Sequence, residues 1–176
     1  MVNYFELFGL PMMFDVDKKA LTTKYYALTK EWHPDKFTFD GSEKQEEARK
    51  KSSEINEGYK VLKNQHHRIR HILDCLNAAP VEGQDKMPQT FLMEMMDINE
   101  AIMDYKMDPS DEAKDSIDKQ ISQYESEWWT DFLTATAKFD FNNPDANKLA
   151  AVKDYYLKSK YLVRLKQNVQ NREIEL

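Results

Sequence analysis

The fold of the first half of the chain depends on one short stretch, Trp32-His33-Pro34-Asp35-Lys36-Phe37. Apolar residues before it recur at helical spacing from Leu21 to Trp32, which predicts a helix that ends here. The helix cannot continue through Pro34, because proline disfavours helical geometry in the residue that precedes it. A polar loop over residues 38–42 follows, and then a charged helix with apolar residues on one face. The stretch therefore forms the corner between two antiparallel helices.

The composition predicts a mostly helical protein with a buried core. Of the 176 residues, 41% are hydrophobic, which is enough to bury a core and excludes wholesale disorder. The low content of 4 glycines and 6 prolines argues against a many-turned β-barrel or sandwich. The single cysteine, Cys75, excludes an intramolecular disulfide framework.

The sequence favours a soluble protein. Its apolar runs are all shorter than the roughly 18 residues that cross a bilayer, so no membrane partner is expected. The first residues lack the basic and apolar segments of a secretory signal. We therefore expect a cytoplasmic protein, or one of the mitochondrial matrix if the chain is a processed eukaryotic form. Nucleic acid is not an expected partner, because an isoelectric point near 5.3 disfavours contact with phosphates.

The charge divides the chain into two units. Residues 1–76 carry 13 basic and 12 acidic side chains, whereas the remaining 100 residues carry 12 and 19. Between them, residues 77–87 contain proline, glycine and polar side chains that interrupt any apolar period. We predict an all-α protein with an N-terminal unit over residues 1–76, a linker over 77–87 and a C-terminal bundle of three helices over 88–176. A monomer is the expected oligomeric state.

Prolines predict where the three helices of the second unit begin. A proline is tolerated in the first helical turn, where its missing N–H costs nothing. The prolines in question are Pro88, Pro109 and Pro144. The nearby capping candidates are Thr90, Asp108 and Asn143. The first of these helices is expected to run unbroken with a core stripe from Phe91 to Tyr105.

The residues His33, Pro34 and Asp35 carry chemistry suited to a contact with another protein. Pro34 fixes its own φ and holds the loop rigid, so the neighbouring side chains project at defined angles. The Asp35 carboxylate can pair with a cation on a partner, and such a charge-assisted bond is stronger than a neutral one. His33 can donate, accept or stack. Because no nucleophile, paired carboxylate or glycine-rich phosphate loop accompanies them in the sequence, we expect neither enzyme activity nor a cofactor.

In its helical context this triplet resembles the signature of a J-domain, the module by which DnaJ-type co-chaperones engage DnaK-type chaperone ATPases. The resemblance covers residues 1–76. Further stretches are similar to the HscB family, the J-type co-chaperones of iron–sulfur cluster assembly, and these are Asn3 to Pro11, His33 to Phe37 and Phe91 to Glu94. The resemblance implies a J-domain hairpin with short flanking helices. It also implies that the protein stimulates the ATPase of an HscA-like chaperone and delivers an IscU-like scaffold to it.

The resemblance implies which residues contact the chaperone. They are His33, Pro34 and Asp35, with Lys24, Lys30 and Lys36 as a basic face. Tyr26 and Ala27 stand where other J-domains often have basic residues, so this positive face is thin. The alternative for the three lysines is simple solvation of an exposed helix face.

A second segment, residues 91–104, carries more apolar surface than a core stripe requires. Methionines, among them Met103, lie beside the stripe, and acidic residues run along the same face. In the HscB family the corresponding face docks IscU, which implies a scaffold-binding role for Leu92, Met93, Met96, Asp97, Glu100, Asp104 and Tyr161. The alternative is that the methionines are buried against other helices.

Two other interpretations remain open at this point. The spacing of His67, His71 and Cys75 places all three on one helical face, as metal ligands could be, although Arg68 and Arg70 would repel a dication. In that case the protein would handle metal. Alternatively, the J-domain would serve another client or a general DnaK.

Overall fold

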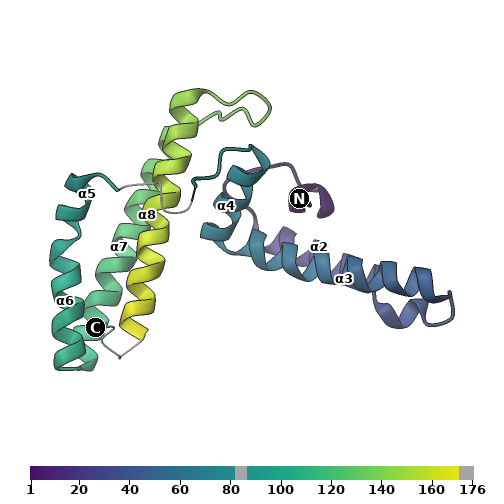
Figure 1. The fold of residues 1–176 in the computed structure, drawn as a ribbon, viewed down its shortest axis with the longest axis horizontal. Helices are drawn as coiled ribbons and strands as arrows, with labels where there is room; N and C mark the ends of the chain where they lie inside the picture. Colours follow the sequence, from purple (N-terminus) through teal and green to yellow (C-terminus); the bar gives the residue numbers. More distant parts are fainter. Residues whose placement is uncertain (82–86, 171–176) are drawn as a thin grey trace. The chain divides into compact units, whose positions relative to one another are not determined.

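The structure is a computed structural model and describes residues 1–81 and 87–170 (Figure 1). The chain divides into two compact units, Met1–Ala78 and Ala79–Leu176. Within the described residues all regular structure is helical, which confirms the prediction of an all-α fold. The centre of the predicted linker, residues 82–86, and the end of the predicted C-terminal bundle, residues 171–176, lie outside the described residues.

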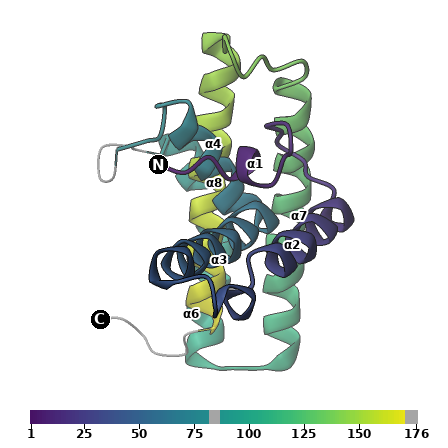
Figure 2. The same cartoon turned by 90° about the vertical axis from the view of Figure 1, so that its right-hand side faces the viewer.

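The first unit is built on a hairpin of two helices. It contains α1 (Tyr4–Leu7), α2 (Lys18–Glu31), the 3-10 helix η1 (Pro34–Phe37), α3 (Ser42–Lys63) and α4 (Gln65–Cys75). Both Figures 1 and 2 show α2 and α3 side by side, with η1 in the connection at the far end. The predicted corner is therefore the turn of this hairpin.

Local capping explains where these helices begin and end. The Asp17 carboxylate accepts from the backbone N–H groups of Lys19 and Ala20, which starts α2. Trp32 ends α2 two residues before Pro34, as the proline rule requires. Asn64 ends α3 and also starts α4, because its side chain accepts from the N–H of His67.

The core of the first unit is formed where α1 and α4 pack on α3. Gly58 of α3 is needed for this packing, since a Cβ there would lie 2.8 Å from the Tyr4 ring. The buried Arg68 of α4 donates to the carbonyls of Phe14 and Leu62 at 2.8 and 2.6 Å, which ties the loop before α2 to the end of α3. These contacts hold the base of the hairpin and leave its far end projecting.

In the described residues, the second unit is a bundle of three long helices with one short helix before them. It contains α5 (Gln89–Glu94), α6 (Met96–Met107), α7 (Asp111–Ala135) and α8 (Ala146–Gln170), with α6, α7 and α8 in mutual contact. The predicted first helix is correct in position but is broken at Met95, whose backbone (φ −89°, ψ 1°) leaves helical geometry. Met95 itself stays buried in the core that α5 and α6 share, so the break does not interrupt the apolar stripe.

The predicted helix starts in the second unit need a correction. Pro88 lies just before α5 instead of inside its first turn, and the other two prolines also precede their helices. The cap of α7 is Ser110, which accepts from the N–H of Ala113, and Asp145 accepts from the first N–H groups of α8. The predicted caps Thr90, Asp108 and Asn143 are therefore wrong. For α7 and α8, side chains two positions after the predicted caps reach the free N–H groups instead, whereas α5 follows Pro88 without a side-chain cap.

No helix in the described parts of the chain is long and apolar enough to cross a membrane.

Candidate functional site

The corner at the end of the hairpin is organised by His33. Its side chain caps η1, because the Nδ1 atom accepts from the backbone N–H of Asp35 at 3.3 Å. Its carbonyl oxygen accepts from the N–H of Lys36 at 3.0 Å. Pro34 occupies the first position of η1, where it has no N–H to leave unsatisfied. The three residues of the triplet are therefore one hydrogen-bonded turn.

The functional groups of this turn face solvent. The side chain of His33 is 51% exposed and that of Asp35 is 89% exposed. The Asp35 carboxylate lies 3.6 Å from Nδ1 of His33, and most of its surface remains open to a partner. An exposed carboxylate held at a fixed place can form a charge-assisted bond without first being uncovered.

Contacts around the turn hold it rigid. The rings of Trp32 and Phe37 stack across its base with centroids 5.8 Å apart. The hydroxyl of Thr38 donates to the Asp35 carbonyl at 2.8 Å, and the side chain of Gln45 on α3 donates to the Thr38 carbonyl at 2.8 Å. The corner is thus fastened to both helices of the hairpin.

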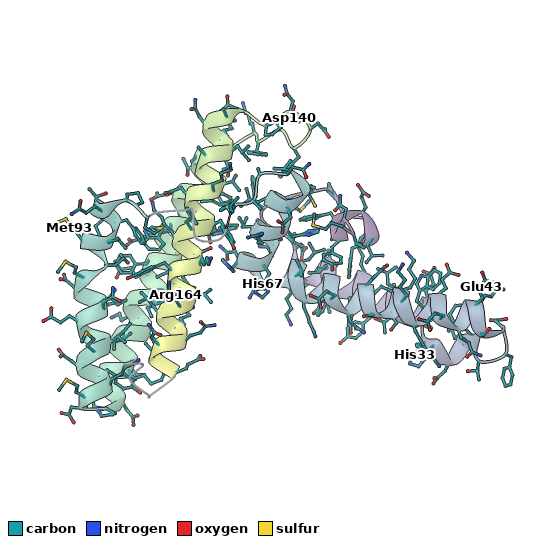
Figure 3. All side chains as sticks on the ribbon, viewed as in Figure 1. His33, Glu43, His67, Met93, Asp140 and Arg164 are labelled. Atoms are coloured by element: carbon teal, nitrogen blue, oxygen red, sulfur yellow. The ribbon has the colours of Figure 1, made fainter. Side chains whose placement is uncertain are left out.

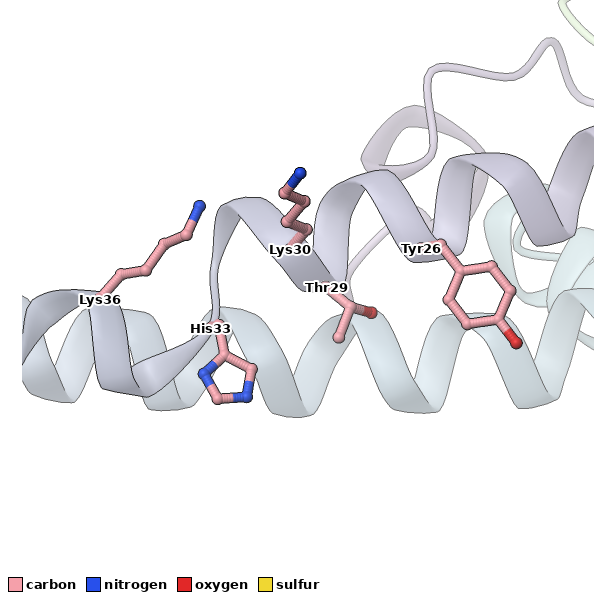
Figure 4. A pocket seen from close by; sticks show the side chains of 5 residues that line it. All are labelled: Tyr26, Thr29, Lys30, His33 and Lys36. Atoms are coloured by element: carbon pink, nitrogen blue, oxygen red, sulfur yellow. The ribbon is translucent and has the colours of Figure 1, made fainter.

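A shallow, open hollow of about 390 Å³ lies beside the turn (Figure 4). Its lining residues are Tyr26, Thr29, Lys30, His33 and Lys36. In Figure 4 the ammonium groups of Lys30 and Lys36 extend to the same side of the ribbon. Tyr26 is expected on this face from the sequence, whereas Thr29 is not, although its spacing with Tyr26 and His33 marks one face of a helix.

Lys24 lies apart from this group. It is not among the residues that line the hollow, and its Nζ atom donates to the carbonyl of Gly9 at 2.7 Å. The structure therefore places Lys30 and Lys36 together beside the turn. The third predicted lysine, Lys24, instead holds the loop after α1.

The second unit carries an exposed apolar surface on α5 and α6, which we call the methionine face. Met96 is 63% exposed and Met107 is 78% exposed, and the other members are also open to solvent. The members of the methionine face are Leu92, Met93, Met96, Met103 and Met107. Figure 3 shows Met93 on the side of α5 away from α7 and α8. The sequence analysis missed Met107, which follows Met96 and Met103 at helical spacing.

Acidic side chains border the methionine face. Asp97, Glu100 and Asp104 are all exposed and follow one another on α6 at intervals of three and four residues. This spacing places them along one side of the helix, next to the row of methionines. The surface therefore combines adaptable thioethers with negative charge.

Tyr161 of α8 supports this surface from below. Its hydroxyl accepts from the side-chain amide of Asn99 on α6 at 2.7 Å. Its ring meets Phe91 of α5 edge to face, with centroids 5.4 Å apart. Because Tyr161 is half-buried against the bundle core, its main effect is to hold α5 and α6 in place.

The alternative metal site does not assemble. His71 is buried, its Nε2 atom accepts from the backbone N–H of Tyr4 at 3.1 Å, and Cys75 Sγ lies 3.6 Å away. Burial raises the pKa of the Cys75 thiol, which disfavours the thiolate that would bind metal. His67 is exposed and lies against His66 instead. In the described segments, no three His, Cys, Asp or Glu side chains are placed to hold a metal ion.

Both units match known protein families. Residues 3–71 match the family model described as the DnaJ domain. Residues 87–170 match the model described as the HSCB C-terminal oligomerisation domain. A DnaJ domain with an exposed His-Pro-Asp turn defines a J-domain co-chaperone, the class to which the fold and the corner assign this chain.

Whole-chain relatives narrow the class. A co-chaperone protein HscB homolog of Vibrio atlanticus is 32% identical over 87% of this chain and 98% of the relative. The homolog of Colwellia psychrerythraea is 30% identical over 99% of this chain and 98% of the relative. The structure of chaperone HscB from Vibrio cholerae is 26% identical, covers 96% of both chains and has a TM-score of 0.75. The human co-chaperone HscB shares the fold, with a TM-score of 0.83 at 22% identity over 100% of this chain and 84% of that one.

The chain belongs to the HscB co-chaperone family. This assigns it a general role in iron–sulfur cluster assembly, with an Hsp70-type chaperone as its partner. Co-chaperones of this kind are generally not enzymes and act through the chaperone that they bind.

Proposed function

We propose that the protein stimulates the ATPase of an HscA-like chaperone of the DnaK type and delivers an IscU-like scaffold protein to it. The corner would bind the chaperone, and the methionine face with its acidic border would bind the scaffold. The carrying observation is that the His33-Pro34-Asp35 turn is both exposed and hydrogen-bonded into one conformation. The expected compartment is the cytoplasm, because the curated relatives named above are bacterial proteins.

The chaperone contact would use the triplet together with Lys30 and Lys36. The two ammonium groups line the same hollow as the exposed imidazole and would pair with acidic side chains on the ATPase. Stimulation requires that the corner bind the ATP-hydrolysing conformation of the chaperone better than the others. Lys24 would contribute indirectly, since its ammonium group is bonded to the Gly9 carbonyl.

The scaffold contact would use Leu92, Met93, Met96, Asp97, Glu100 and Asp104, with Tyr161 holding the surface in shape. Exposed methionines adapt to the contour of a partner, and this adaptation needs no rearrangement of the bundle core. The acidic border would steer a scaffold whose docking surface is basic.

Joining both contacts in one chain would make the assembly tighter than either contact alone. Once the scaffold is held, its effective concentration near the chaperone is set by the chain that links the two units. Only two lysines line the hollow beside the turn, so the chaperone contact alone would be weak. Simultaneous binding of the scaffold would strengthen the assembly.

The test is the steady-state ATPase rate of an HscA-like chaperone with this protein, with an IscU-like scaffold, and with both. We expect each addition to raise the rate modestly and the two together to raise it more than the sum. The same assay with a general DnaK separates a dedicated from a general co-chaperone. Equal rates with and without this protein would contradict the proposal.

A further inference from the structure

The loop between η1 and α3 presents a phenyl ring to solvent. Phe39 is 98% exposed, more than any other large apolar side chain in the described part of the chain. Nearby rings do find partners, since Trp32 stacks on Phe37 and Tyr25 stacks on Tyr59. Single exposed apolar residues are common on surfaces, so exposure alone does not assign a role.

The backbone that carries Phe39 is fastened to the corner. The N–H of Asp40 donates to the Phe37 carbonyl at 3.1 Å, which closes a turn around Phe39. Thr38, directly before it, is bonded both to the Asp35 carbonyl and to Gln45 of α3. The position of Phe39 relative to Asp35 is therefore set by hydrogen bonds.

Phe39 is also close enough to share an interface with the triplet. Consecutive Cα atoms are 3.80 Å apart, so the Cα atoms of Asp35 and Phe39 are separated by at most about 15 Å. A standard interface buries about 800 Å² on each partner, which corresponds to a disc of about 16 Å radius. A chaperone centred on the exposed Asp35 carboxylate would therefore reach Phe39.

We propose that Phe39 is a further specificity-determining residue of the chaperone contact, and that its ring is buried in an apolar recess of the DnaK-type chaperone when the corner binds. This inference rests on the proposed function of the corner. An aromatic anchor with two side-chain torsions loses little conformational entropy on burial. Its apolar contact would add affinity to an interface in which the hairpin supplies only two lysines.

Full-length Phe39→Ser is the main test, with the HscA-like chaperone and the ATPase rate as the readout. We expect the concentration for half-maximal stimulation to rise about tenfold with an unchanged plateau, as for loss of an aromatic hot spot. Phe39→Leu, which keeps an apolar side chain, should stay within about twofold of the wild type. Val81→Ser, at another exposed apolar position outside the corner, should behave as the wild type.

Cross-linking gives an independent readout of the same contact. A photoreactive p-benzoylphenylalanine at position 39 should capture the chaperone, and the same group at position 81 should not. A Phe39→Ser titration that matches the wild type, a lowered plateau at unchanged half-maximal concentration, or capture of a second copy of this chain would each overturn the inference.

The failure of this inference is distinguishable from failure of the proposed function. If the wild type stimulates and His33→Gln does not, while Phe39→Ser behaves as the wild type, only the role of Phe39 is lost. If the wild type neither stimulates nor is captured from position 39, both are lost.

Discussion

His33 stabilises the turn at the end of the hairpin before any partner binds. Its Nδ1 atom accepts from the backbone N–H of Asp35, so the proton of the neutral ring is on Nε2. That leaves the Nε2–H group as a donor available to the chaperone. One imidazole therefore orders the turn with one nitrogen and offers a hydrogen bond with the other.

Replacing His33 by Gln should abolish stimulation of the chaperone ATPase. The amide side chain has one more rotatable bond than the imidazole and only one end that carries polar atoms, so it cannot both cap η1 and present a donor to the chaperone. Far-UV circular dichroism should be unchanged, because an exposed loop residue is replaced. The matched control is His67→Gln, which alters an exposed histidine on α4 and should retain full stimulation. Retained stimulation by His33→Gln would count against the role of the corner.

His71 makes the stability of the first unit depend on pH. Burial lowers the pKa of His71, and the charge of Asp74 opposes this only in part. The neutral ring also accepts from the N–H of Tyr4, which a protonated Nε2 could not do. The unfolded chain therefore binds the proton more readily than the folded one. The contribution of His71 to stability is complete above the usual histidine pKa of about 6.5 and is lost as the pH falls below it.

Replacing His71 by Gln should flatten this pH dependence. Glutamine keeps a hydrogen-bond acceptor for Tyr4 and does not titrate. Urea unfolding at pH 7.5 and pH 5.5 should show a smaller loss of unfolding free energy for His71→Gln than for the wild type. His67→Gln should show the wild-type loss, because His67 is exposed. Equal pH dependence in the wild type and His71→Gln would contradict the assignment.

At the scale of elements, the break at Met95 divides the methionine face between two helices. Leu92 lies on α5 and Met96 on α6, yet both are exposed. Replacing Leu92 and Met96 together by Ala should weaken binding of an IscU-like scaffold about tenfold or more, because two interface side chains lose their apolar contacts. Calorimetric titration of the scaffold measures this change.

The same double variant should leave stimulation of the chaperone in the absence of scaffold unchanged. Neither side chain belongs to the bundle core, so thermal unfolding should also stay close to the wild type. Leu133→Ala, on an exposed part of α7, is the matched control and should bind scaffold as the wild type does. Undiminished scaffold binding by the double variant would place the docking surface elsewhere.

Sequence predicts some of these elements and not others, for physical reasons. The end of α2 is predictable because the proline rule involves only neighbouring residues. The break at Met95 is not, because the apolar stripe continues across it and the periodicity stays intact. The caps of α7 and α8 differ from the predicted ones because several polar residues precede each helix, and backbone geometry selects among them.

In the candidate sites, too, local motifs can be predicted from the sequence, whereas features that depend on tertiary packing cannot. The triplet is recognisable as a local motif, whereas the exposure that makes it usable depends on how α1 and α4 pack at the other end of α3. The resemblance groups Lys24 with Lys30 because both match basic positions of the family on the helix before the triplet. Its bond to the Gly9 carbonyl, fifteen residues earlier in the chain, depends on the path of the loop after α1.

At the scale of the whole molecule, the proposed contacts lie on different compact units. The first unit contains the corner, and the second contains the methionine face. Synergy between chaperone and scaffold therefore requires that one chain hold both sites in working order. Two chains with one defective site each cannot bring the scaffold to the chaperone.

Mixing His33→Gln with the Leu92→Ala/Met96→Ala double variant tests this requirement. Each variant should lack synergy in the ATPase assay, and an equimolar mixture should also lack it. Recovery of synergy in the mixture would show that chains associate and share their sites. That result would contradict the prediction of a monomer, which sedimentation of the wild type checks directly.

The bond between Tyr161 and Asn99 has a consequence for engineering this protein. Tyr161 touches both α5 and α6 from α8, through its ring on one and its hydroxyl on the other. The shape of the methionine face therefore depends on α8, although none of the residues that define this face belongs to α8. A peptide copied from residues 89–107 would contain every methionine and carboxylate of this surface. It would lack Tyr161, which holds α5 and α6 at their observed spacing.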